Sequence, residues 1–245
     1  MVHTLASRSR TVFVRHSGTV QPTINRLVPH GLVPLIVVLA SVCALVVTTL
    51  GLLFAGEHTG TAVDDYVHWS VYRQFVGERG LLQAMLTPTD PVLLVVVIGL
   101  IVMGAVALRR PRLAVLAVAG PVLSAVFSSA VLKPAFGRTI NNGSLAFPSG
   151  HTATMVAVLT VLVLATFATR TTVLVLTAAG ALIVAVIGAT ALVGMKYHYI
   201  TDTVGGACVA IATVLTVALV IDRAAGRRTV KNAARDEEPV TSGTR

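Results

Sequence analysis

The chain has 245 residues, of which 55% are hydrophobic and only 12% carry a charge. A soluble domain carries about 25% charged residues, so this composition excludes an ordinary water-soluble protein, a disordered chain and a coiled coil. The formal net charge is +9, but the basic residues lie mainly between and outside the apolar runs. A bilayer explains that distribution better than nucleic acid does.

Six apolar runs are long enough, or nearly long enough, to cross a bilayer as helices. A helix needs about 20 residues to cross roughly 30 Å of hydrocarbon. The runs cover residues 32–55, 91–108, 113–132, 152–169, 171–193 and 203–221, and each is almost free of charge. We therefore predict an all-α integral membrane protein with six transmembrane helices in a bundle, formed by residues 31–222. The first run begins too far along the chain for a secretory signal, so we expect a retained span.

The basic residues predict the orientation of these spans. If the N-terminus is cytoplasmic, 14 of the 19 Lys and Arg residues lie on the inner side, and the outer side holds Arg73, Arg79, Lys133, Arg138 and Lys196. Positive residues concentrate on the cytoplasmic side of membrane proteins. We therefore expect both termini in the cytoplasm of a cell-membrane protein, with a basic tail at 1–30 and a polar tail at 223–245.

The outer segment 57–90 differs from the other connections. It carries aromatic residues at intervals of three: Tyr66, Trp69, Tyr72 and Phe75. Such a pattern suits a short interfacial helix between spans one and two, with its aromatic rings at headgroup depth. The helix would anchor the protein or shape a lateral opening for lipid. His58 and His68 lie here without paired ligand spacing, so we expect both on the surface.

Two short outer loops hold the polar groups that can do chemistry. The first follows the third run; it contains Lys133 and Arg138 and ends in a Pro-Ser-Gly-His motif at 148–151. Both cations neutralise phosphate, and arginine adds a planar fork of donors. Ser149 is a suitable N-cap for the next helix, and the free N–H groups of a first turn bind anions. Gly150 allows close backbone approach, with His151 at the edge of this anion site.

The second loop follows the fifth run and contains Lys196, His198 and Asp202. His198 and Asp202 are four residues apart, so they share one face if a helix begins here. A carboxylate that binds one imidazole nitrogen fixes the tautomer and leaves the other nitrogen free to attack. With His151 as acid and base, the loops predict metal-free phosphoryl transfer in which His198 forms a phosphohistidine. A zinc site made by the same three side chains is the alternative, although no cluster of metal-ligand spacing supports it.

These residues resemble the type-2 phosphatidic acid phosphatase superfamily, which includes bacterial lipid pyrophosphate phosphatases and vanadium haloperoxidases. Three motifs characterise the family: Lys, six residues and Arg-Pro; Pro-Ser-Gly-His; and Ser-Arg, five residues, His, three residues and Asp. The second motif is complete here, and the third keeps His198 and Asp202, followed by Gly205-Gly206. The resemblance covers about residues 120–215, which we take as the catalytic part.

Two positions depart from the family pattern. The Arg-Pro of the first motif falls on Ile140-Asn141, although Arg138 stands two positions before it. The Ser-Arg of the third motif falls on Ala191-Leu192. The first motif is therefore degenerate but still basic, whereas the third lacks a phosphate-binding arginine, which Lys196 is our candidate to replace.

The resemblance implies a role for each matching residue. His198 is the nucleophile, Asp202 orients it, and His151 is the acid and base. The phosphate is bound by the remaining matching residues: Lys133, Arg138, Ser149 and Gly150. The family needs no metal and no organic cofactor.

We therefore expect a membrane phosphatase with its active site on the extracytoplasmic face. Its substrate would be a lipid phosphate or pyrophosphate, such as polyprenyl pyrophosphate, phosphatidylglycerophosphate or phosphatidate, and its partners would be membrane lipids and not nucleic acid. A related alternative is a phosphotransferase that uses an acceptor other than water. A transporter or channel is disfavoured because the spans hold few polar residues near the bilayer centre. An inactive lipid-binding protein is suggested by Ala191-Leu192.

Overall fold

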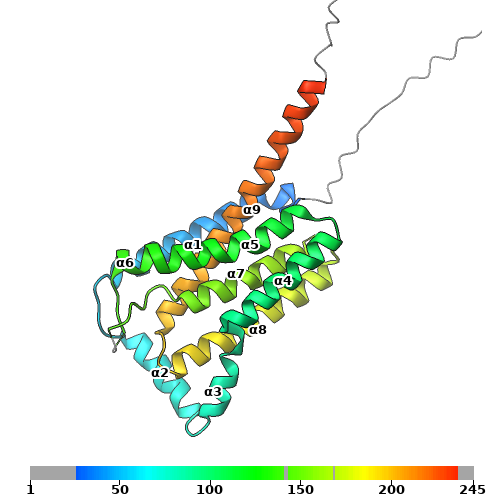
Figure 1. Ribbon diagram of the computed structural model, residues 1–245. Coiled ribbons are helices and arrows are strands. Elements are labelled where there is room, and N and C mark those ends of the chain that lie inside the picture. The colour runs from blue at the N-terminus through cyan, green and yellow to red at the C-terminus, as the bar shows by residue number, and fades with distance from the viewer. Residues whose placement is uncertain (1–25, 141–142, 168, 237–245) are drawn as a thin grey trace, which may run out of the picture.

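The computed structural model describes residues 26–140, 143–167 and 169–236, and this part of the chain is helical apart from short loops and one isolated bridge between Thr139 and Leu145. Figure 1 shows a bundle of long helices, with α2 and α3 together at one end. The elements in chain order are η2 (His30–Leu32), α1 (Val33–Leu53), α2 (Ala62–Gln74), α3 (Arg79–Met85), η3 (Thr87–Thr89), α4 (Pro91–Ala107), α5 (Pro111–Val126), η4 (Phe127–Leu132), α6 (Lys133–Phe136), α7 (Gly150–Ala165), α8 (Thr171–Gly194) and α9 (Ile200–Asp236). The predicted all-α class is confirmed.

Five helical stretches of the described chain are long and apolar enough to span a membrane: His30–Leu53, Arg79–Ala107, Pro111–Phe136, Thr171–Gly194 and Ile200–Arg228. The fourth predicted run forms a shorter apolar helix, Gly150–Ala165. Leucine and valine side chains cover the outside of α4 and α8, where Leu100 is 57% and Leu182 66% exposed. An apolar outer surface of this extent suits contact with lipid hydrocarbon, so the protein is a multi-pass membrane protein.

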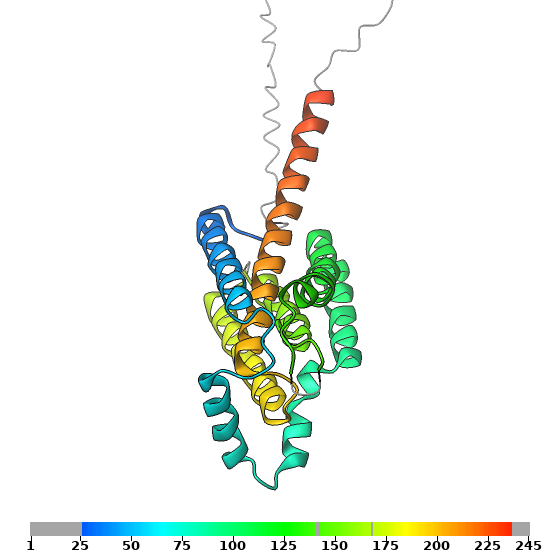
Figure 2. The ribbon, with the colours of Figure 1, turned by 90° about the vertical axis from the view of Figure 1, so that its left-hand side faces the viewer.

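Helix α9 lies at the centre of the packing, with α1 on one side of it and α4 and α5 on the other (Figure 2). It contacts α1, α5 and α7, and α5 in turn packs against α4 and α7. The core between them is built from small and branched side chains, including Ala157, Val161 and Val214. A Cβ on Gly120 of α5 would lie only 3.2 Å from Val214 Cγ2, so the small residue allows α5 and α9 to approach closely. This close packing fixes the helix ends that carry the candidate residues.

The end of the bundle away from α2 and α3 (Figure 1) is held together by a buried carboxylate. Asp222 of α9 accepts hydrogen bonds from the backbone N–H groups of Leu27 and Val28, each at 3.0 Å, and forms an ion pair with Arg112 at 3.1 Å. The segment before α1, the start of α5 and the outer part of α9 therefore meet at this end. The loops that follow α6 and α8 lie at the other end (Figure 1), so the candidate residues share one face, as we predicted. That this face is extracytoplasmic stays a prediction.

Three features differ from the predicted elements. Two short helices replace the single interfacial helix, because Gly77, at φ +83°, turns the chain between α2 and α3. The third span continues through a π-helical segment, Phe127–Leu132, to Lys133, and a π-bulge of this kind often accompanies a functional site. Helix α9 continues to Asp236, so the first part of the predicted polar tail is helical. Of the two predicted tails, residues 1–25 and 237–245 lie outside the described residues.

Candidate active site

The Pro-Ser-Gly-His motif forms the beginning of α7. The Ser149 hydroxyl caps the helix, accepting from the backbone N–H of Thr152 at 3.3 Å. The backbone N–H of Ser149 donates to the carbonyl oxygen of Asp202 at 3.0 Å, which ties α7 to the start of α9. The N–H groups of Gly150 and His151 lie in the first turn, where no intrahelical carbonyl is available to them. Two N–H groups beside His151 are thus suited to an anion.

The two candidate histidines lie side by side. The ring centroids of His151 and His198 are 5.9 Å apart with an interplanar angle of 62°. His198 is only 7% exposed, whereas His151 is exposed. The structure therefore brings together the two imidazoles that the sequence placed in separate loops, and their chemical roles remain predictions.

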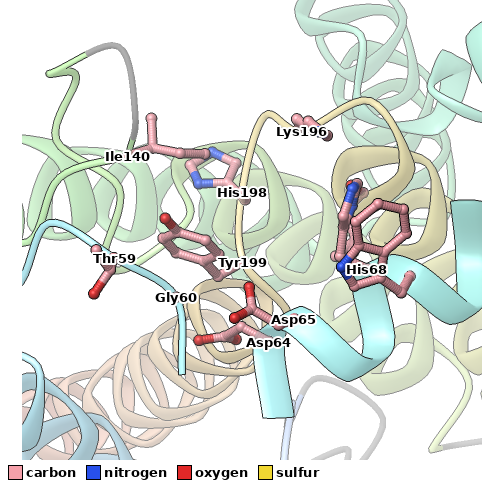
Figure 3. A pocket seen from close by; sticks show the side chains of 11 residues that line it. Thr59, Gly60, Asp64, Asp65, His68, Ile140, Lys196, His198 and Tyr199 are labelled. Carbon is pink, nitrogen blue, oxygen red and sulfur yellow. The ribbon is translucent and has the colours of Figure 1, made fainter. Parts of the chain in front are cut away.

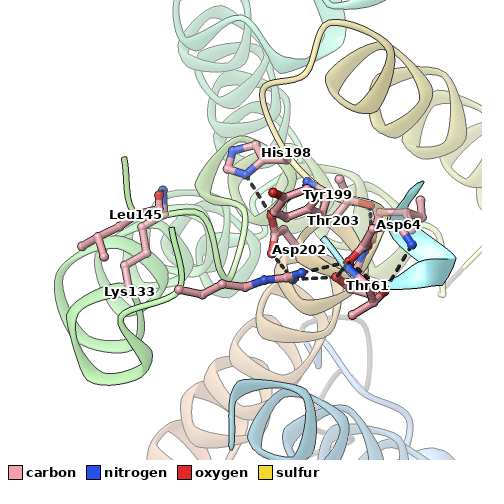
Figure 4. A network of polar contacts seen from close by, with 11 residues as sticks. Thr61, Asp64, Lys133, Leu145, His198, Tyr199, Asp202 and Thr203 are labelled. Atoms are coloured by element: carbon pink, nitrogen blue, oxygen red, sulfur yellow. Dashed lines mark hydrogen bonds and ion pairs between the residues drawn. The ribbon is translucent and has the colours of Figure 1, made fainter. Parts of the chain in front are cut away.

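Asp202 lies behind His198 (Figure 4). The distance from His198 Nδ1 to Asp202 Oδ2 is 3.7 Å, within ion-pair range but too long for a hydrogen bond. Asp202 Oδ2 also accepts from the backbone N–H of Tyr199 at 2.9 Å. His198 Nδ1 is buried and has no hydrogen-bond partner among the described atoms. A small movement of Asp202 would thus form or remove the hydrogen bond that orients the imidazole.

Arg138 occupies a different position from the one expected of a phosphate ligand. Its side chain is fully buried, donating from Nη1 to Asp202 Oδ1 and from Nη2 to Asp64 Oδ2, each at 2.8 Å. The guanidinium carbon lies 4.4 Å from the ring centroid of Phe54 and 4.6 Å from that of Tyr199. Carboxylates and aromatic rings thus surround this cation, so its predicted contact with phosphate gains no support from the geometry.

Asp64 is a site-associated residue that the sequence analysis missed. It stands in a Thr61–Asp64 capping box at the start of α2, and it accepts from the backbone N–H and the hydroxyl of Thr201 at 3.0 and 2.9 Å. Burial raises the pKa of its carboxyl, but hydrogen bonds from Thr61, Thr201 and Arg138 outweigh burial and hold that pKa below its ordinary value. The capping-box spacing is the sequence signal that could have found the helix start.

The two predicted lysine ligands differ in their surroundings. Lys133 Nζ donates to the carbonyl oxygen of Leu145 at 2.9 Å, which spans the first loop. Lys196 is exposed and has a left-handed backbone conformation, with φ +60°. A cavity of about 490 Å³ lies beside Lys196 and His198 (Figure 3). Its other walls include residues from the segment before α2, from α2, from the end of α8 and from both loops: Thr59, Gly60, Asp64, Asp65, His68, Trp69, Ile140, Val193 and Tyr199.

A second hollow of about 590 Å³ lies beside His151. It is bounded by Tyr197 and Leu192 and by the beginning of α4, where Val92 is 73% exposed. The two histidines therefore border different spaces. The one beside His198 has charged walls, and the one beside His151 extends to the apolar outside of α4.

His68 contradicts the expectation of a surface residue. It is half-buried, its Nδ1 lies 3.1 Å from the carbonyl oxygen of Val193, and it lines the cavity shared with His198. His58, by contrast, is exposed as expected. A single histidine on an amphipathic helix carries no local signal that distinguishes these two outcomes.

The ionisation of Tyr199 reflects the charges that surround it. Burial raises the pKa of its phenol, Arg138 lowers it, and the nearby carboxylates of Asp202, Asp64 and Asp65 raise it further, so that the pKa lies above its ordinary value.

In the described part of the chain, no group of three or more His, Cys, Asp or Glu side chains is placed to hold a metal ion. The zinc alternative therefore has no ligand set there.

Comparison with known proteins gives one match. A family model described as the PAP2 superfamily matches residues 91–225, more than half of the chain. Neither the curated proteins nor the solved structures include a match. The matched region holds all the candidate residues predicted from the sequence, whereas α1, α2 and α3 lie before it.

Proposed function

Because the chain belongs to the PAP2 superfamily, we propose that it is a metal-independent membrane phosphatase that hydrolyses a lipid phosphate or pyrophosphate through a phosphohistidine. Family membership supports a phosphoric ester hydrolase in general. The observation that carries the finer proposal is the pair of imidazoles 5.9 Å apart, one at the start of α7 and one in the loop before α9, with a buried carboxylate behind the second. This is the arrangement that a nucleophile, an orienting group and a proton donor require.

The first chemical step is attack by His198. Its Nε2 forms a bond to phosphorus while the bond from phosphorus to the leaving oxygen breaks. His151 gives a proton to that oxygen, and Asp202 stabilises the positive charge that develops on the His198 ring. In the second step His151 takes a proton from water, the water oxygen attacks phosphorus, and the N–P bond breaks, which releases phosphate and restores His198.

The charge on the phosphoryl oxygens must be balanced during both steps. Lys133 and Lys196 supply positive charge near the two loops, and the N–H groups of Gly150 and His151 supply donors at the positive end of α7. Ser149 contributes mainly by holding that helix start, since its hydroxyl is already engaged by Thr152. The exposed Lys196 beside His198 supports its proposed role as the replacement for the missing third-motif arginine.

A lipid substrate is supported by the hollow beside His151. The group that His151 protonates lies on that side, and the hollow continues onto the exposed apolar residues Val92, Leu93 and Val96 of α4. The lipid alcohol would thus remain in contact with hydrocarbon while its phosphate reaches the histidines. Polyprenyl pyrophosphate, phosphatidylglycerophosphate and phosphatidate are the proposed candidates, and the distribution of Lys and Arg supports an extracytoplasmic active site in the cell membrane.

The test is phosphate release from a panel of these lipids by purified protein in the presence of EDTA. We expect turnover by the wild type, none by His198→Ala or His151→Ala, and full turnover by the matched control His58→Ala, whose histidine is exposed. After brief incubation with radiolabelled substrate and an alkaline quench, the wild type should carry acid-labile label on His198, and His198→Ala should carry none. Turnover by His198→Ala equal to that of the wild type would overturn the proposal, and loss of wild-type turnover in EDTA would favour metal catalysis.

A further inference from the structure

We propose that Asp64, which lies before the family-matched region, is a positioning residue for the nucleophile and acts on His198 through Arg138 and Asp202. This inference rests on the proposed function. It assigns to the start of α2 a role in the reaction, and it assigns to Arg138 the task of holding Asp202 in place of binding phosphate.

An unbroken series of contacts leads from Asp64 to His198. Asp64 Oδ2 and Asp202 Oδ1 are each 2.8 Å from a different terminal nitrogen of Arg138. Asp202 Oδ2 then faces His198 Nδ1 at 3.7 Å. The side chains of Asp64, Arg138 and Asp202 are all essentially inaccessible to solvent, so water does not interrupt the chain of contacts from α2 to the imidazole (Figure 4).

The buried network of Asp64, Arg138 and Asp202 carries more negative than positive charge. Two buried carboxylates surround one guanidinium, which leaves one negative charge without a partner inside the network. A buried charge is costly unless it is paired, and Asp202 faces the imidazole of His198 at 3.7 Å and also interacts with the ammonium group of Lys133. Asp64 therefore contributes to the field at His198 although it does not touch the ring. The other titratable groups close to this ring and its carboxylate are His151, Lys196, Tyr199 and Lys133, which the proposed variants leave unchanged.

The same network also sets the position of the Asp202 carboxylate. The orientation of the guanidinium is fixed by Asp64 and by Thr201, whose hydroxyl accepts from Arg138 Nη1 at 2.7 Å and donates to Asp64 at 2.9 Å. Arg138 in turn fixes Oδ1 of Asp202, which determines where Oδ2 stands relative to His198. Since that separation is already longer than a hydrogen bond, a shift of a few tenths of an ångström in Asp202 changes how well His198 is oriented.

The decisive variant is Asp64→Asn, which removes the charge with little change in shape. We expect kcat for the preferred lipid phosphate to fall about tenfold, as coupling within one hydrogen-bond network allows, with KM changed less than twofold because Asp64 does not bind substrate. Thr201→Val, a milder change to the same network, should lower kcat by a smaller factor. The matched control is Glu78→Gln, an exposed carboxylate of the same outer segment, and it should alter neither constant.

A second measurement does not require turnover. The rate at which diethyl pyrocarbonate modifies His198, followed by mass spectrometry at one fixed pH, reports how the imidazole is held and how accessible its nitrogen is. Asp64→Asn loosens the hold of Arg138 on Asp202, and so the hold of Asp202 on the ring. We therefore expect a several-fold change in the modification rate in Asp64→Asn and no change in Glu78→Gln. Unchanged kcat together with unchanged His198 reactivity would overturn the inference, as would a KM that rises as much as kcat falls. If the wild type hydrolyses no lipid in the panel, the proposed function fails, and the modification rates still decide the role of Asp64.

Discussion

Replacement of Gly206 by alanine tests whether the close approach of α9 to the start of α7 builds the site. Gly206 is buried in the second turn of α9. A Cβ at this position would overlap the carbonyl oxygen of Ser149 and lie 3.1 Å from Thr152 Cβ and 3.3 Å from the backbone nitrogen of Ala153. The Ser149 oxygen already accepts from that nitrogen at 2.9 Å, so it cannot move away without loosening the first turn of α7. The two helices must therefore separate.

The expected magnitude follows from two opposing terms. Overpacking a well-packed site costs about 1–3 kcal/mol, whereas alanine is favoured over glycine inside a helix by about 1 kcal/mol. The net result for Gly206→Ala is destabilisation of up to about 2 kcal/mol. Gly226, in the same helix, has no atom within 4 Å of the position that a Cβ would occupy, so Gly226→Ala should stabilise the protein by about 0.5–1 kcal/mol.

Thermal unfolding of both variants in one detergent compares these signs directly. Gly206→Ala should also lower phosphate release, because separation of the helices stretches the 3.0 Å hydrogen bond between the Ser149 N–H and the Asp202 carbonyl. Gly226→Ala should release phosphate at the wild-type rate. A Gly206→Ala variant that is as stable as Gly226→Ala, or that keeps full activity, would show that this helix contact neither limits the packing nor shapes the site.

Three further changes test other parts of the structure. Asp222→Asn should lower the free energy of unfolding by about 1–3 kcal/mol while leaving kcat unchanged, since it weakens a buried carboxylate site at the opposite end of the bundle; a changed kcat would contradict that separation. Because the pKa of Asp64 is lower in the folded protein than its ordinary value, its carboxylate stabilises the folded state above the unfolded-state pKa of about 4. This contribution is lost as the pH falls through the lower pKa of the folded state. The difference in melting temperature between the wild type and Asp64→Asn should therefore shrink below about pH 4, and a constant difference would contradict this. Lys196→Ala should raise KM several-fold and Lys196→Arg should not, and equal KM values for all three proteins would exclude Lys196 from the phosphate site.

The sequence predicted the class of fold well because hydrophobicity reports burial in hydrocarbon residue by residue. The long apolar runs became helices, and Ser149 capped α7 where its position before an apolar run indicated. The π-helical segment Phe127–Leu132 was not predicted, since nothing in its composition separates it from an α-helix. The extension of α9 to Asp236 was also missed, because its last turns carry too many charges to resemble a span.

The candidate site was predictable only where its residues stand in short motifs. His151, His198 and Asp202 were identified from local spacing, and their proximity in the structure depends on α7 and α9 packing together. Asp64 contacts Thr201, although the two residues are 137 positions apart in the sequence, and no sequence pattern near either residue indicates that contact. Arg138 illustrates the same limit, since an arginine in a loop looks alike in sequence whether its partner is a phosphate or a carboxylate.

The arginine missing from the first motif can be restored to test where the phosphate binds. Ile140 lines the cavity shared with His198, and its backbone N–H donates to the Ser144 carbonyl at 3.0 Å, which holds the loop in place. Arginine at this position would direct a charged fork of donors at the cavity. A hydrogen bond to a charged group contributes about 1.5–3 kcal/mol, so Ile140→Arg should lower KM about tenfold or more, whereas the neutral variant Ile140→Gln should not. Measuring KM for a lipid phosphate and the inhibition constant of inorganic phosphate separates head-group binding from tail binding, because a true phosphate contact improves both. If the arginine variant matches the glutamine variant in both constants, the phosphate does not reach this cavity and the assignment of Lys196 fails with it.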